Sequence, residues 1–69
     1  MHNPKVSKRE SEVLNLIAME YTCFEISDLL HLSHNTIKTH KKNLYIKLDV
    51  KNAAGLIRRA FELRLLRLD

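Results

Sequence analysis

Four stretches of the chain show apolar residues at helical spacing, and each follows a residue that commonly begins a helix. Ser7 stands three residues before Glu10, and Thr22 stands three residues before Glu25. This spacing predicts a capping box at the start of each of the first two helices, with Glu10 partly buried as a cap. Ser33 is a good N-cap for the third helix. The pattern predicts helices at about 8–20, 23–31, 34–48 and 53–65.

The predicted third helix has two distinct faces. Ile37, Leu44 and Leu48 form a narrow apolar stripe that we expect to lie in the core. The opposite face holds no carboxylate, although surface helices usually mix charges of both signs. Lysine, asparagine, threonine and an exposed aliphatic side chain suit contact with DNA phosphates, base edges and thymine methyl groups. The residues of this face are Asn35, Lys38, Thr39, Lys42 and Ile46.

The predicted fourth helix, which Asn52 can cap, is more apolar than a small core requires. Its apolar residues span about 200° of arc, whereas a helix on one core needs roughly 100°. We therefore expect it to contact a second copy of the chain or another domain. The dimer contacts expected on it are Ala53, Leu56, Ile57 and Ala60.

Length, composition and charge favour one small all-α domain that binds a polyanion. Residues 1–69 are 45% hydrophobic and 29% charged, which fits a folded domain, with residues 1–5 as a flexible start. One glycine and one proline leave little turn material for a sheet. The net charge is +4, with acidic residues gathered in the first half of the chain and basic residues in the second. Such a dipolar domain attracts nucleic acid.

Several function classes find no support in the sequence. We expect no membrane span and no signal peptide, because no apolar run is long enough. A lone Cys23 excludes an internal disulfide and fits the cytoplasm. His31 and His34 lack the further ligands of a zinc site, and the single Gly55 excludes a glycine-rich phosphate loop. We expect neither an enzyme nor a bound metal or cofactor.

The strings SKRESEVL, EIS, LS, TIKTH and NLYIKL, at residues 7–14, 25–27, 32–33, 36–40 and 43–48, follow one another without gaps in a specific family pattern. Through them the chain resembles the LuxR/FixJ/NarL-type (GerE-like) DNA-binding domain of bacterial transcription regulators, response regulators among them. The resemblance covers about residues 6–66. It implies a four-helix bundle containing a helix-turn-helix, with the third helix in the major groove of DNA.

The resemblance also implies roles for individual residues. Lys38, Thr39 and Lys42 match positions that face base edges. A dimer through the fourth helix would read a roughly palindromic operator in double-stranded DNA, and RNA polymerase is a further partner. The positions that match phosphate contacts are Thr22, Asn35, Thr36 and Lys41.

Five residues depart from the family pattern, among them Cys23, which stands where the family has asparagine. Glu20 and Asp49 stand where the family has glycine. At Glu20, the first helix is therefore expected to end later or to bend differently. At Asp49 no such change is expected, because aspartate tolerates a left-handed backbone. Phe24 and Ala53 stand where the family has basic residues. We expect Phe24 to pack on another side chain, and DNA affinity to be weakened.

Two other functions remain open at this point. A helix-turn-helix of this kind also forms the promoter-binding domain of a sigma factor, in its region 4. Alternatively, the same fold with its apolar fourth helix and Phe24 would serve as a protein-interaction module.

Overall fold

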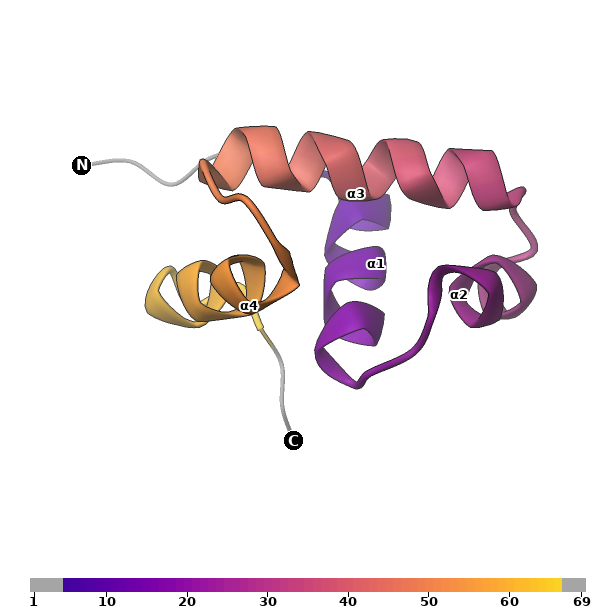
Figure 1. Ribbon diagram of the computed structural model, residues 1–69, viewed down its shortest axis with the longest axis horizontal. Helices are drawn as coiled ribbons and strands as arrows, with labels where there is room; N and C mark the ends of the chain where they lie inside the picture. The colour runs from indigo at the N-terminus through magenta and orange to yellow at the C-terminus, as the bar shows by residue number, and fades with distance from the viewer. Residues whose placement is uncertain (1–4, 67–69) are drawn as a thin grey trace.

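The computed structural model describes residues 5–66, which form four helices and, within that range, no strand (Figure 1). The prediction of a flexible start at residues 1–5 lies, apart from Lys5, outside the described residues. Helix α3 runs along one edge of the domain and packs against each of the other three helices. None of the described helices is long and apolar enough to cross a membrane. The helices are α1 (Lys8–Ala18), α2 (Cys23–Leu30), α3 (His34–Leu48) and α4 (Ala53–Glu62).

All four helix starts lie where the sequence predicts them. Ser7 caps α1 in a complete capping box, in which its Oγ accepts from the Glu10 N–H at 3.1 Å and its N–H donates to Glu10 Oε1 at 2.9 Å. Thr22 makes the same box for α2, and Ser33 and Asn52 cap α3 and α4. Each cap satisfies a backbone N–H that has no partner inside the helix.

Three helices end earlier than predicted, and all four end in the same way. A residue with positive φ follows each helix, and the next residue donates its N–H back to a carbonyl five positions earlier. For α1, Glu20 has a φ of 70° and the Tyr21 N–H reaches the Leu16 carbonyl at 3.1 Å. This is the Schellman arrangement, which usually employs glycine. The other left-handed residues are His31, Asp49 and Arg64.

The glycine-to-glutamate departure therefore does not lengthen α1, which ends at Ala18 with Met19 as its C-cap. Glu20 adopts the left-handed backbone that glycine would adopt there. Asp49 does the same after α3, as predicted from its tolerance of that conformation.

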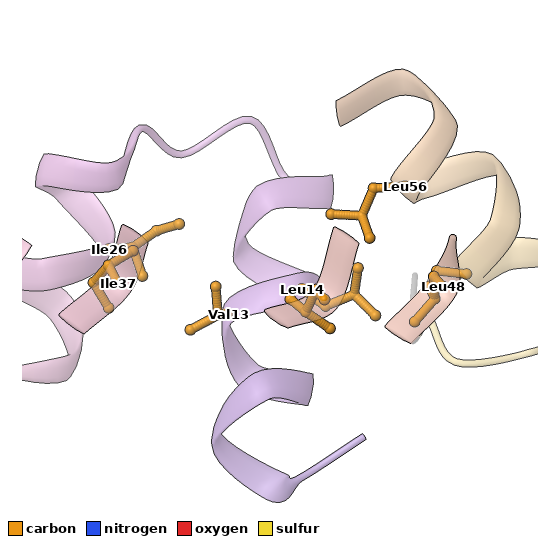
Figure 2. Packing of buried hydrophobic residues seen from close by; sticks show 8 residues of the cluster. Val13, Leu14, Ile26, Ile37, Leu48 and Leu56 are labelled. Atoms are coloured by element: carbon orange, nitrogen blue, oxygen red, sulfur yellow. The ribbon is translucent and has the colours of Figure 1, made fainter. Parts of the chain in front are cut away.

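The core is a single cluster to which every helix contributes (Figure 2). The predicted stripe on α3 is confirmed, because Ile37, Leu44 and Leu48 are all buried. Figure 2 shows Ile37 beside Ile26 at one side of the cluster and Leu48 toward Leu56 at the other. The remaining buried apolar residues are Val13, Leu14 and Ala60.

The predicted dimer contacts on α4 need correction. Leu56 and Ala60 are fully buried against α1 and α3 and cannot meet a second copy, so this part of the prediction was wrong. Ile57 is half-buried against the core, and Ala53 is exposed. The chain leaves the helical path after Glu62, and the apolar residues that follow pack back on the core, which absorbs much of the apparent apolar excess.

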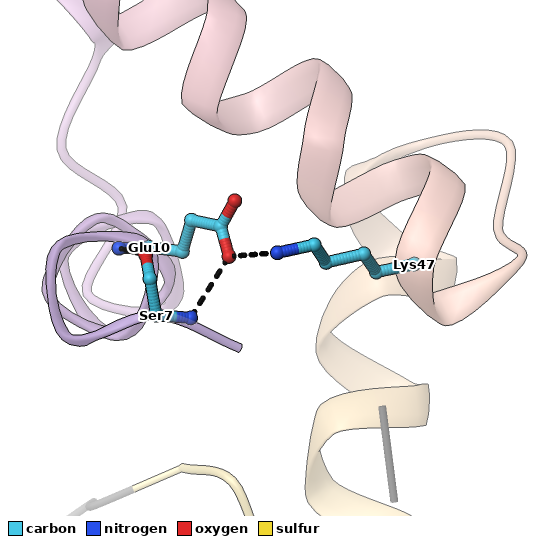
Figure 3. Close-up of polar contacts among 3 residues, drawn as sticks. All are labelled: Ser7, Glu10 and Lys47. Carbon is cyan, nitrogen blue, oxygen red and sulfur yellow. Dashed lines mark hydrogen bonds and ion pairs between the residues drawn. The ribbon is translucent and has the colours of Figure 1, made fainter. Parts of the chain in front are cut away.

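A half-buried ion pair joins the first turn of α1 to the end of α3 (Figure 3). Glu10 is only 4% exposed, and its Oε1 lies 2.7 Å from Lys47 Nζ. Burial raises the pKa of the Glu10 carboxyl, but the hydrogen bonds from Lys47 and Ser7 and the charge of Lys47 outweigh it, so the pKa lies below its ordinary value. The sequence predicted a buried cap at Glu10 and did not reveal its partner.

Glu10 should make the stability of the domain depend on acid pH. A lowered pKa means that folding favours the ionised carboxylate. Its contribution is present above the ordinary pKa of about 4.3 and is lost as the pH falls through the folded-state value. We expect Glu10→Gln to lower the free energy of unfolding by about 1–2 kcal/mol at neutral pH, since Lys47 is partly exposed. Thermal melts from about pH 7 to about pH 3 should show the gap to the wild type closing.

Glu12→Gln is the matched control for this measurement. Glu12 pairs with Arg9 at 3.2 Å on the surface, so its loss should matter little at any pH. A gap between Glu10→Gln and the wild type that stays constant down to about pH 3 would contradict the role of the ionised carboxylate.

Candidate nucleic-acid interface

One side of α3 is uncovered by the described part of the chain. Helices α1, α2 and α4 all lie on the other side of α3 (Figure 1). No acidic residue occurs anywhere in α3. The uncovered side, called the outer face below, consists of the exposed residues Asn35, Lys38, Thr39, Lys42 and Ile46.

The outer face presents two lysines, an aliphatic surface and hydroxyl and amide groups within three helical turns. Thr39 Oγ1 donates to the Asn35 carbonyl at 3.1 Å, which ties its hydroxyl to the helix backbone. Ile46 is 67% exposed, although a large aliphatic side chain gains by burial. A rigid helix with this mixture can place cationic groups at phosphates or guanine and apolar atoms at thymine methyl groups.

The structure gathers only some of the predicted site residues. Lys38, Thr39 and Lys42, predicted to face bases, lie together on the outer face with Asn35. Lys41 lies on the flank of α3, half-buried, with its Nζ 5.8 Å from the centre of the Tyr45 ring.

The two predicted phosphate-binding threonines serve as parts of helix caps. Thr22 Oγ1 accepts from the Glu25 N–H at 3.2 Å at the start of α2. Thr36 Oγ1 lies 2.8 Å from Ser33 Oγ at the start of α3. Each hydroxyl can still offer its remaining hydrogen-bonding capacity to a ligand.

One contact between the starts of α2 and α3 was not predicted from the sequence. The rings of Phe24 and His34 stack face to face, with centroids 3.9 Å apart and planes inclined by 4°. The expectation that Phe24 packs on another side chain is confirmed, and the partner is the first residue of α3. The only signal in the sequence was an aromatic residue near the start of each of two consecutive helices.

The histidines do not assemble a metal centre in the described chain. No three His, Cys, Asp or Glu side chains of residues 5–66 come together as metal ligands. His31 occupies the turn after α2, while His34 lies against Phe24.

The fold closely matches solved structures. The structure of the transcription factor GerE superposes with a TM-score of 0.85 at 32% identity, over 91% of this chain and 94% of that one. The response regulator ChrA of a heme-sensing two-component system superposes with a TM-score of 0.86 at 31% identity, over 94% of this chain and 32% of that one.

Curated relatives are considerably longer than this chain. It is 42% identical over 59 residues to the uncharacterized response regulatory protein YgeK of Escherichia coli (strain K12), covering 86% of this chain and 40% of YgeK. It is 44% identical over 61 residues to the transcriptional activator protein EsaR of Pantoea stewartii subsp. stewartii, covering 88% of this chain and 24% of EsaR. The chain thus spans well under half of either protein.

The family pattern of "Bacterial regulatory proteins, luxR family" matches residues 4–60. This range includes all four helix starts, the core stripe of α3 and the outer face. The protein therefore belongs to the luxR family of bacterial regulatory proteins.

Proposed function

We propose that this domain binds double-stranded DNA sequence-specifically as the DNA-binding part of a bacterial transcription regulator. The observation that carries the proposal is the outer face of α3, which is exposed, free of carboxylates and backed by a buried stripe on the same helix. With α3 in the major groove, Lys38 and Lys42 would reach guanine or phosphate, and the Thr39 methyl would meet a thymine methyl. Family membership favours this function over that of a sigma-factor promoter domain.

Phosphate contacts would fix the domain on the duplex. Thr22 at the start of α2 and Asn35 and Thr36 in the first turn of α3 lie at the helix N-termini, where backbone N–H groups and helix dipoles also attract anions. Lys41 would act from the flank of α3. Contacts with phosphates contribute affinity and orientation, whereas contacts with base edges contribute specificity.

A homodimer through the exposed side of α4 would place two α3 helices on one operator. Phe61 is 67% exposed on α4, and Ala53 and the half-buried Ile57 complete this corrected set of contacts. A two-fold dimer implies a roughly palindromic site with half-sites about 10 base pairs apart.

Selection from a pool of random DNA duplexes tests the proposed function. The domain should enrich a palindromic sequence at about 50 mM salt, and its dissociation constant should rise steeply toward about 200 mM, because lysines release counterions from the phosphates. The sequence enriched from the pool would identify the operator of this proposed cytoplasmic regulator. Absence of any enriched sequence at low salt would contradict the proposal.

A further inference from the structure

The Phe24–His34 stack lies where α2 and α3 begin, and its two rings differ in exposure. Phe24 is 68% exposed, while His34 is half-buried. Face-to-face stacking at 3.9 Å covers one face of the imidazole. The ring N–H groups point outward in the plane of the ring, so stacking of this kind leaves them available.

The described residues leave the imidazole without a polar partner. Among residues 5–66, no hydrogen bond or ion pair engages the imidazole of His34. The neighbouring hydroxyl side chains at the start of α3 do have hydrogen-bond partners, because Ser33 and Thr36 bond to each other. The ring is therefore held in place by an apolar contact while its donor capacity is unused.

The stack also stands at a particular place relative to the outer face. His34 precedes Lys38 by four residues, so the two side chains occupy neighbouring positions on the same side of α3, one turn apart. Phe24 lies in the first turn of α2. In a helix-turn-helix the second helix enters the major groove while the first crosses the sugar–phosphate backbone. A residue that joins the starts of these two helices lies close to the phosphates bordering the groove.

We propose that His34 donates a hydrogen bond from its imidazole N–H to a DNA phosphate oxygen, with Phe24 as the positioning residue that holds the ring. This inference rests on the proposed function. Imidazole carries an N–H donor in its neutral as well as its protonated form, so the contact does not require a charged histidine. Stacking fixes the ring before DNA arrives, which lowers the entropy lost on binding.

The arrangement compensates for the missing basic residue at position 24. Where the family has a flexible cationic side chain at the start of α2, this chain has the aromatic ring of Phe24. The proposed phosphate contact is made instead by His34, at the start of α3.

Replacement of single phosphates by neutral methylphosphonates tests this contact. The probe is the duplex enriched from the random pool, with one phosphate per half-site replaced at a time. We expect the wild type to lose about tenfold in affinity when the phosphate facing His34 is replaced. His34→Phe should bind the unmodified duplex about tenfold more weakly and be insensitive to replacement at that same position.

His34→Phe separates a phosphate contact from a structural role, because it preserves an aromatic stack on Phe24 and removes both ring nitrogens. Its thermal melting should match that of the wild type. Phe24→Ala should retain sensitivity at that phosphate with an affinity between those of the wild type and His34→Phe. His31→Asn is the matched control, since it removes a nearby imidazole from a left-handed position that asparagine tolerates, and it should leave the profile unchanged.

The possible failures are distinguishable. If the wild type enriches a duplex and His34→Phe has the same methylphosphonate profile as the wild type, the phosphate contact is wrong and the proposed function stands. If the wild type enriches no duplex, the proposed function is wrong, and the role of His34 fails with it.

Discussion

Simultaneous replacement of Lys38, Thr39 and Lys42 by alanine is expected to abolish sequence-specific DNA binding and leave the fold intact. All three side chains are exposed on the outer face and none belongs to the core. Each correct base contact of this kind contributes about 1–3 kcal/mol of discrimination, so the triple variant should lose more than about a hundredfold in preference. Alanine has the highest helix propensity, so α3 should remain helical.

The measurement compares dissociation constants for the enriched duplex and for a scrambled duplex, alongside a thermal melt. The double variant Lys8→Ala and Lys51→Ala is the matched control. It loses the same number of positive charges, two, from exposed positions outside the outer face. This control should bind DNA more weakly than the wild type does, and more weakly still as salt rises, but keep the same sequence preference. If the triple variant still enriches the wild-type sequence, base reading by these residues is refuted.

Leu44→Ala is expected to remove a large part of the stability of the domain. Leu44 is fully buried in the second half of α3, the helix against which all the others pack. Truncation of a buried leucine costs about 2–5 kcal/mol. A domain of this size has a total stability of about 3–10 kcal/mol, so the variant should melt at a much lower temperature than the wild type and, at the low end of that range, be largely unfolded at room temperature.

Circular dichroism during thermal and urea unfolding measures the effect. Ile46→Ala is the matched control, since it truncates an aliphatic side chain of the same helix that is 67% exposed, and its stability should be near that of the wild type. A Leu44→Ala variant that melts with the wild type would mean that the core cluster does not stabilise the fold as described.

The helix starts could be predicted, whereas three of the four helix ends could not, for a local physical reason. Serine, threonine and asparagine caps act within three residues and are visible in the sequence, as at Ser7 and Asn52. The ends depend on left-handed residues, and in this chain those are Glu20, His31 and others that carry no glycine signal. The one glycine of the chain, Gly55, lies inside α4 instead.

Side-chain periodicity located the outer face of α3, because a single helix has only one side opposite its apolar stripe. Periodicity could not tell which neighbour covers an apolar residue, so Leu56 was expected at a dimer contact and lies in the core. Contacts between helices were equally invisible. The pairing of Lys47 with Glu10 and the stacking of His34 on Phe24 depend on how the helices cross.

The division of α3 into a buried stripe and an outer face has an evolutionary consequence. Mutations at Lys38 or Lys42 alter exposed side chains that lie outside the core cluster, so a duplicated gene can drift at these positions without a compensating change in the core. Ile37 and Leu44, in contrast, are fully buried in the cluster to which all four helices contribute. With DNA read through the outer face as proposed, paralogous copies of such a domain would acquire separate target genes while their interiors stay nearly the same.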